Sequence, residues 1–185
     1  MVDVIEITIE EFKKDIYSRY EKLFPPEEQR EWKNVEDTYK KGVEKFYKIT
    51  EKGQTVGFFM LVKLDDNHPF YLDYFAIFEE FQNSGYGTDA IKVLFEKIVN
   101  NDGLFGEIEK EVEDNPITTK RFEFYKRLGF EKVDSEYLLY KVLFIPIIKC
   151  NSKRYSKEEV DKIFFDYYRF GCGEEAVKKH CRIIK

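Results

Sequence analysis

The sequence contains little of what several protein classes require. Among its 185 residues are three cysteines, five prolines and two histidines. An odd number of cysteines, in a chain that starts without the basic and apolar regions of a signal peptide, predicts reduced thiols rather than a disulfide framework. No apolar run approaches the roughly 18 residues that a membrane helix needs. We therefore expect a cytoplasmic protein with no membrane partner.

Metal and nucleic-acid binding are also poorly supported. His180 and Cys181 are neighbours and Cys172 lies upstream, but no CxxC spacing accompanies them. Zinc sites usually have such a spacing, so we expect no metal and interpret these residues as ordinary thiols in the C-terminal segment. The net charge is −5, with lysine and glutamate interspersed. The chain thus lacks a basic field for a nucleic-acid backbone.

Aromatic residues are abundant, with 18 Phe and 13 Tyr, and 43% of the chain is hydrophobic. This composition argues against disorder, and the length suffices for one domain with a packed core. Hydrophobic spacing predicts a short strand, a helix pair, three strands, a helix, a strand, a helix and two strands. That order is a mixed α/β fold around one sheet. The sheet domain is predicted at 1–145, and a helical extension at 146–185 is predicted to pack on the domain or on a partner.

Three local signals are the clearest. Thr8-Ile-Glu-Glu11 and Ser156-Lys-Glu-Glu159 are typical of capping boxes at helix starts. The run FYLDYFAIF at 70–78 is almost wholly apolar, which predicts a central strand with Asp73 as its exception. A strand predicted at 104–113 alternates apolar residues with glutamates, so one of its faces is acidic.

The run FQNSGYGTDAIKVLFEKI at 81–98 places Gly85 and Gly87 before a helix predicted at 88–99. The unpaired N–H groups and the dipole of a helix start bind anions, and glycine lets a phosphate approach the backbone. A plain loop with positive φ values is the alternative. A P-loop is excluded, because GxxxxGK followed by Ser or Thr is missing. Gly85, Gly87 and Ala90 meet a dinucleotide fingerprint, but 79–84 separate them from their strand, and two helices and two strands precede them.

A third motif fits better: Gln or Arg, two residues, Gly, one residue, then Gly or Ala. Gln82-Asn-Ser-Gly85-Tyr-Gly87 matches it, and FYKRLGF at 124–130 supplies a second motif. With this order of elements, the chain from about Val4 to about Ile145 resembles the GCN5-related N-acetyltransferase (GNAT) family. The resemblance implies a GNAT-like acyl-CoA N-acyltransferase fold, an acyltransferase activity and acetyl-CoA as the co-substrate.

The resemblance also implies a set of acetyl-CoA-binding residues. The backbone around the glycines would hold the pyrophosphate, and a splayed strand would pair with the pantetheine arm. Thr118 stands where many relatives have an asparagine that contacts the cofactor, which puts the contacts to the adenosine end in doubt. The implied residues are Phe75, Ala76, Ile77, Gln82, Asn83, Ser84, Gly85, Tyr86, Gly87, Thr88 and Thr118.

By the same resemblance, Tyr125 is the acid that protonates the leaving thiolate; packing at a helix end is the alternative. Asp73 is the first candidate for the base, and a carboxylate satisfied by backbone N–H groups is equally compatible. Tyr71 stands where some histone-type relatives have a base glutamate. Glu109, Glu111 and Glu113 are reserve candidates if their face lines the cleft, and a solvated edge face is the alternative.

The predicted function is acetyl-CoA-dependent transfer of an acetyl group to a primary amine of a small, cationic molecule. The acidic strand and the net charge favour that acceptor. Acetylation of a protein N-terminus or of lysine is a second option within the class. A non-catalytic acyl-CoA sensor or interaction module is an option outside it. The partners predicted are therefore a small-molecule amine acceptor and, as an open option, a second copy of the chain in a homodimer.

Overall fold

A computed structural model describes residues 2–100, 102–111, 116–151 and 153–185. The chain forms two compact units, each with its own core. Unit 1 comprises residues 1–65 and 72–100, and unit 2 comprises residues 66–71 and 101–185. In the described part of the chain, no helix is long and apolar enough to cross a membrane.

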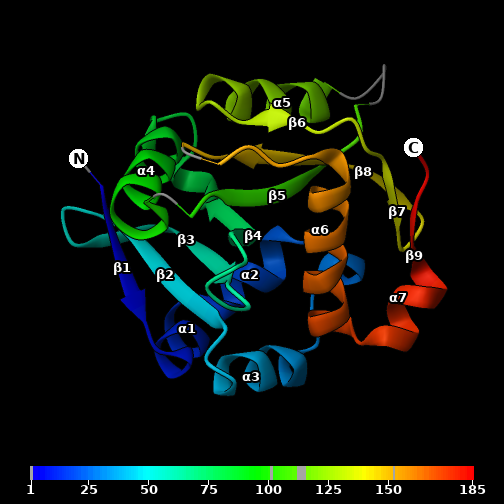
Figure 1. Cartoon of the computed structure of the whole chain (residues 1–185). Helices are drawn as coiled ribbons and strands as arrows, with labels where there is room; N and C mark the ends of the chain where they lie inside the picture. The colour runs from blue at the N-terminus through cyan, green and yellow to red at the C-terminus, as the bar shows by residue number, and fades with distance from the viewer. Residues whose placement is uncertain (1, 101, 112–115, 152) are drawn as a thin grey trace. The chain divides into compact units, whose positions relative to one another are not determined.

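Unit 1 is a sheet with helices, and its strand order is β1-β2-β3-β4. The strands are β1 (Asp3–Ile7), β2 (Glu44–Glu51), β3 (Gln54–Val62) and β4 (Phe70–Ile77), whose first two residues belong to unit 2. β1 pairs antiparallel with β2, as the blue and cyan ribbons of Figure 1 show, and β2 pairs antiparallel with β3. The turn between them at Lys52 and Gly53 has positive φ values, as tight hairpin turns require.

The helices of unit 1 follow the predicted signals with local differences. They are α1 (Ile9–Asp15), α2 (Tyr17–Leu23), η1 (Pro26–Glu28), α3 (Trp32–Lys40), η2 (Glu79–Phe81), α4 (Tyr86–Leu94) and the π-helical turn η3 (Phe95–Val99). The capping box at Thr8 is present. The first helix breaks at Ile16, which has ψ −35° but φ −125°, and the helix predicted at 88–99 starts two residues earlier, at Tyr86.

The core of unit 1 is built from aromatic rings. Phe12 packs on Phe46 at 4.6 Å and on Phe58 at 5.6 Å between ring centroids, and Tyr20 meets Tyr74 edge-on at 4.9 Å. All five side chains are buried. Such pairs add to the stability that burial of their area provides, and they fix helices α1 and α2 on the sheet.

Unit 2 holds the remaining strands and helices. Its strands are β5 (Leu104–Glu109), β6 (Glu131–Lys132), β7 (Tyr137–Leu139), β8 (Val142–Lys149) and β9 (Cys181–Ile183). β5 pairs with the start of β4 at Phe70↔Leu104 and Tyr71↔Phe105, and the ladder includes no further pair. β5, β8, β7 and β9 then follow as neighbours, with β6 beside β8. The helices are α5 (Pro116–Arg127), α6 (Lys157–Cys172) and α7 (Glu174–His180).

Several predictions for unit 2 need correction. The strand predicted at 104–113 ends at Glu109, and Val112 and Glu113 lie outside the described residues. β5 lies between β4 and β8 rather than at an edge. The predicted single helix of the extension is followed by α7 and β9, and the predicted boundary between residues 145 and 146 falls inside β8. The capping box at Ser156 is present.

Candidate active site

The loop after β4 is held in shape by Gln82. Its Nε2 donates to the Ile77 carbonyl oxygen at 3.0 Å, while η2 supplies the hydrogen bond from Phe81 N to Phe78 O at 2.8 Å. Asn83 has a φ of +60°, which asparagine tolerates better than most residues. Residues 82–85 are exposed. The side chain of Gln82 therefore closes the loop onto the end of β4 and leaves the loop's outer face accessible.

Gly85 begins helix α4 with a φ of +82°. A Cβ built on Gly85 would meet no heavy atom within 4 Å, so the space in front of it is open. Glycine has no side chain that can cap a helix, and the start of α4 has no hydrogen bond from a capping side chain. The N–H groups of the first turn, which belong to Tyr86, Gly87 and Thr88, have no partner within a helix. An uncapped helix start with open space in front of it suits a phosphate group.

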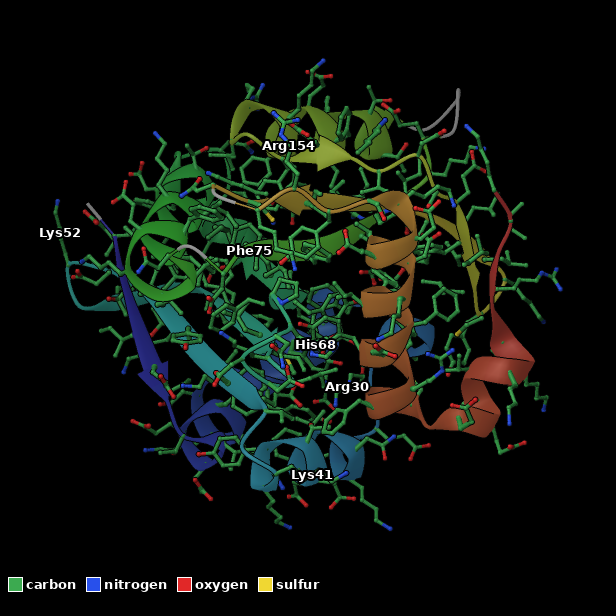
Figure 2. All side chains as sticks on the ribbon, viewed as in Figure 1. Arg30, Lys41, Lys52, His68, Phe75 and Arg154 are labelled. Carbon is green, nitrogen blue, oxygen red and sulfur yellow. The ribbon has the colours of Figure 1, made fainter. Side chains whose placement is uncertain are left out.

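The end of β4 presents its backbone in an alternating pattern. Phe78 N donates to Val56 O at 2.9 Å, and a Cβ built on Gly57 would lie 2.3 Å from Ala76 O. The peptide groups of Ala76 and Phe78 therefore face β3. Because alternate residues of a strand face opposite edges, those of Phe75 and Ile77 point away from β3. The Phe75 ring, labelled in Figure 2, stacks on Phe59 at 4.7 Å.

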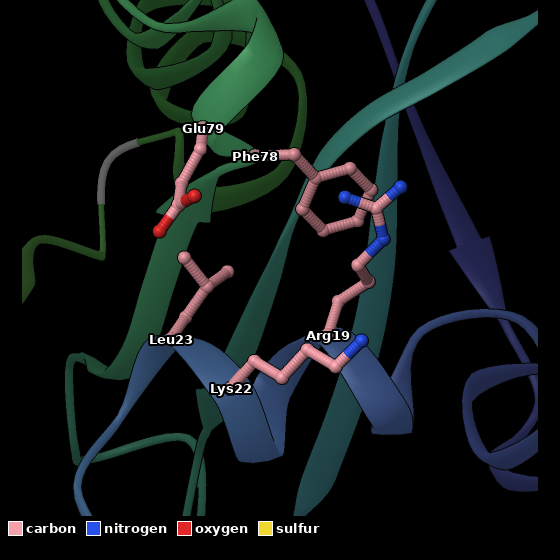
Figure 3. A pocket seen from close by; sticks show the side chains of 5 residues that line it. All are labelled: Arg19, Lys22, Leu23, Phe78 and Glu79. Atoms are coloured by element: carbon pink, nitrogen blue, oxygen red, sulfur yellow. The ribbon is translucent and has the colours of Figure 1, made fainter.

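A small hollow of about 160 Å³ lies beside η2, and Figure 3 shows the five residues that line it. Phe78 and Leu23 are its apolar part, and Arg19, Lys22 and Glu79 are its charged part. The Arg19 guanidinium lies 4.8 Å from the centroid of the Phe78 ring and pairs with Glu80 at 2.8 Å. Ligand pockets usually have volumes of about 300–1,000 Å³, so this hollow fits one small group at most.

Asp73 lies in a buried charge cluster of unit 1. Arg30 Nη1 donates to Asp73 Oδ2 at 2.7 Å and to Glu44 Oε1 at 2.9 Å, and Arg30 Nη2 donates to Thr38 Oγ1 at 3.0 Å. Figure 2 labels Arg30. Its Nε is buried without a hydrogen-bond partner among the described residues. A cationic amine would compete with a buried guanidinium for the Asp73 carboxylate, which disfavours Asp73 as the base.

The same cluster makes stability depend on pH. Burial raises the pKa of Glu44 to about 7 from an ordinary value of 4.5, although Arg30 opposes the shift. At pH values between 4.5 and about 7, Glu44 carries a proton in the native state but not in the unfolded state. The free energy of unfolding therefore falls as pH rises through this range. For Glu44→Gln we expect a much flatter pH profile of the free energy of unfolding, and a smaller loss of stability between pH 5 and pH 8 than in the wild type. Urea unfolding at pH 5 and pH 8 measures both effects.

Glu111→Gln is the control for that experiment. Glu111 is 35% exposed and ion-paired with Lys132 at 2.6 Å, and because surface ion pairs contribute little to stability, its replacement should change the free energy of unfolding much less than that of Glu44. A Glu44→Gln variant with the wild-type slope would contradict a protonated Glu44 in the native state.

Tyr125 lies near the end of α5 in unit 2. Its ring meets Phe124 at 5.1 Å and Phe130 at 5.2 Å, both nearly edge-on, and its carbonyl accepts from Phe130 N at the Gly129 helix stop. The hydroxyl has no hydrogen-bond partner among the residues that the structure describes. Burial raises the pKa of Tyr125 to about 12, and Glu107 adds to the rise while Arg121 opposes it. The hydroxyl therefore keeps its proton at neutral pH.

The other predicted site residues of unit 2 have different surroundings. Thr118 is buried near the start of α5. Glu111 follows the end of β5, and its partner Lys132 also lies 3.7 Å from the centroid of the Phe122 ring. Glu109 closes the β5–β8 ladder opposite Phe144.

Glu107 is the residue whose importance the sequence does not reveal. Tyr71 donates its hydroxyl proton to this carboxylate, at 2.7 Å from Oε1 and 2.6 Å from Oε2, and Tyr168 donates to Oε1 at 2.8 Å. Glu107 also contributes to the raised pKa of Tyr125. The only signal in the sequence is the alternation of glutamates, which does not single out one of them.

The predicted site residues thus fall into two groups. Unit 1 holds the glycine loop, the end of β4 and Asp73, and unit 2 holds Tyr125, Thr118 and Glu111. Within unit 2 the structure brings Glu107 together with two tyrosines. In the described ranges, no group of three His, Cys, Asp or Glu side chains could hold a metal ion. None of the three cysteines forms a disulfide, and burial raises the pKa of Cys150 and Cys181 to about 11.

Comparison with solved structures identifies the fold. A GNAT-family protein from Bacteroides thetaiotaomicron superposes with a TM-score of 0.79 at 21% identity, covering 93% of this chain and 99% of that one. A GNAT acetyltransferase from Elizabethkingia anophelis, solved with acetyl-CoA, has a TM-score of 0.62 at 16% identity, covering 81% and 98%. The ribosomal-protein-S18-alanine N-acetyltransferase from Escherichia coli has a TM-score of 0.56 at 14% identity, covering 84% and 99%. These likenesses confirm the predicted fold.

A comparison of the sequence with models of protein families identifies the family of this chain. No curated protein matches the chain. The model of the acetyltransferase (GNAT) family matches residues 9–130, which is well over half of the chain and includes both the glycine loop and Tyr125. The chain therefore belongs to the acetyltransferase (GNAT) family, which confirms the family and the enzyme class that its two motifs predict.

Proposed function

We propose that this protein transfers the acetyl group of acetyl-CoA directly to a primary amine of a small, cationic molecule. The observation that carries the choice of acceptor is the acidic face of β5. Glu107 and Glu109 lie two residues apart on that face, both are half-buried, and Glu107 acts electrostatically on Tyr125. A carboxylate in a partly desolvated position attracts an ammonium group more strongly than an exposed one.

The residues of unit 1 have a binding role in this proposal. The first-turn N–H groups of α4 would hold the pyrophosphate in the open space at Gly85, with Gln82 keeping the loop in place. The peptide groups of Phe75 and Ile77 would pair with the pantetheine amides. Thr118 is retained as a candidate for a further contact to the donor. Acetyl-CoA, when bound, supplies an activated thioester carbonyl.

The residues of unit 2 move protons. The acceptor arrives as an ammonium ion and must lose a proton before its nitrogen can attack. We assign this proton to Glu107, the half-buried carboxylate of β5 that acts electrostatically on the proposed acid Tyr125. As the C–N bond forms and the C–S bond breaks, Tyr125 donates its proton to the departing sulfur. The nitrogen then passes its surplus proton to the Tyr125 phenolate, which leaves a neutral amide, and Glu107 releases the first proton to solvent.

A matched series of amines tests the acceptor. The amines 1,4-diaminobutane, n-butylamine and 4-aminobutyrate share a four-carbon chain and differ in the charge of the far end. With acetyl-CoA, free-thiol release should give a kcat/KM about tenfold higher for the diamine than for butylamine, and lowest for the amino acid. Equal values, or the reverse order, would contradict a cationic acceptor.

Two further arms separate the remaining options. Peptides with a free N-terminus or an internal lysine test protein acetylation, which would replace the small-molecule proposal if their kcat/KM exceeded that of the diamine. Tight acetyl-CoA binding in calorimetry without thiol release for any amine or peptide would instead indicate a sensor.

A further inference from the structure

The C-terminal helix α6 docks onto the rest of unit 2 through buried aromatic rings. Tyr167 stacks on Tyr71 with centroids 5.0 Å apart, and Phe164 meets Tyr71 edge-on at 5.6 Å. The Tyr167 hydroxyl also donates to the carbonyl of Pro69. Phe164 and Tyr167 are almost fully buried. The ring contacts, which do not require the Tyr167 hydroxyl, fix the rotation and the axial position of the helix relative to the start of β4 and to β5.

The docking places the next residue, Tyr168, on Glu107. The Tyr168 hydroxyl donates to Glu107 Oε1 at 2.8 Å, and its ring stacks on Phe164 at 5.1 Å, one helical turn earlier. Tyr71 donates to both oxygens of the same carboxylate. The carboxylate thus has phenol donors from two elements, and one of them belongs to the segment beyond the part of the chain that the family model matches.

We infer that Tyr168 is a positioning residue for the reaction, so that helix α6 completes the proton-accepting group. This inference rests on the proposed role of Glu107 as the base. Two fixed donors hold the carboxylate plane in one orientation, and charge-assisted hydrogen bonds of this kind are short and directional. A donor to the ionised form also favours that form, so Tyr168 sets the pH at which Glu107 can accept a proton.

Other groups surround Glu107 and contribute to its titration. Tyr71 comes from β4, Tyr125 from α5 and Tyr137 from β7, and the last two interact with Glu107 electrostatically. Glu109 lies on the same face of β5, and the residue opposite Glu107 on β8 is Pro146, which cannot titrate. Helix α6 contributes Tyr168 to this set of groups, as a phenol donor to Glu107.

Tyr168→Phe tests the inference, with Tyr167→Phe as the matched control on the same helix. Phenylalanine keeps the ring contacts, so both variants should fold. In Tyr168→Phe the acidic limb of the kcat/KM profile should move upward by about one pH unit, and kcat should fall about tenfold with little change in KM. Tyr167→Phe should lower the thermal midpoint and leave both kinetic quantities unchanged. If Tyr168→Phe and Tyr167→Phe had the same kcat and the same acidic limb of the kcat/KM profile, the inference would be overturned.

A titration without turnover keeps this inference separate from the proposed function. The Glu107 resonance, identified by its loss in Glu107→Gln, is followed by carbon NMR of carboxyl-labelled protein. If Glu107→Gln retains the wild-type kcat/KM, the base assignment in the proposed function is wrong. If Glu107→Gln is inactive but Tyr168→Phe leaves the Glu107 titration unmoved, the positioning role alone is wrong. An upward shift of that titration in Tyr168→Phe, absent from Tyr167→Phe, supports the positioning role.

Discussion

Gly85→Val is expected to weaken acetyl-CoA binding by at least about 100-fold. The φ of +82° is unfavourable for valine, and the new side chain would occupy the open space where the proposed pyrophosphate lies. A charge-assisted hydrogen bond contributes about 1.5–3 kcal/mol, so losing two of them corresponds to roughly 100-fold or more in affinity. Calorimetric titration of acetyl-CoA measures the loss directly.

Gly42→Val separates backbone strain from blocked binding. Gly42 has a φ of +75°, lies in the same unit and also has open space at its Cβ position, but it belongs to the turn before β2. Both variants should lose similar stability in urea unfolding, by about 1–2 kcal/mol. Only Gly85→Val should lose the ligand. An unchanged affinity in Gly85→Val, or an equal loss in Gly42→Val, would exclude the loop as the pyrophosphate site.

Tyr125→Phe is expected to lower kcat by about 100- to 1,000-fold while the dissociation constant of acetyl-CoA stays the same. Removal of a general acid typically reduces the rate by about 10² to 10⁴. The phenylalanine keeps the ring contacts with Phe124 and Phe130, so packing should be preserved. Because burial raises the pKa of Tyr125 to about 12, this residue should also add no basic limb to the wild-type profile below about pH 11.

The control for Tyr125 is Tyr155→Phe. Tyr155 lies in the same unit, its ring packs on Phe105 at 5.0 Å, and it has no hydrogen bond to another described residue. Its replacement should leave kcat within about twofold of the wild type. Wild-type turnover in Tyr125→Phe, measured by thiol release, would restrict Tyr125 to a packing role.

Local signals in the sequence were sufficient for the starts of α1 and α6 and for most of the strands. Both capping boxes are present because each depends on residues only three positions apart. The hairpin turn at Gly53 and the Gly85 start of α4 also depend on short-range backbone preferences. The break at Ile16 and the π-helical end of α4 carried no comparable local signal.

The candidate site was predictable only in part, for the same physical reason. The glycine loop is a continuous segment, so its position follows from its motif. The partners of Glu107 lie 36 and 61 residues away along the chain, and Arg30 is 43 residues from Asp73. Periodicity places a carboxylate on a face of a strand, but the fold alone determines whether a tyrosine, an arginine or water meets it there.

The pairing of β9 bears on how the protein matures during synthesis. Every residue of unit 1 precedes position 101, whereas unit 2 needs Cys181 and Ile183 of β9 to pair with Leu139 and Tyr137. Ribosomes release the chain from its N-terminus, and compact units tend to fold as they emerge. We therefore expect unit 1 to form while unit 2 is still being translated. Glu107 would acquire its Tyr168 donor only after residue 168 has been translated, so the enzyme should stay inactive until then.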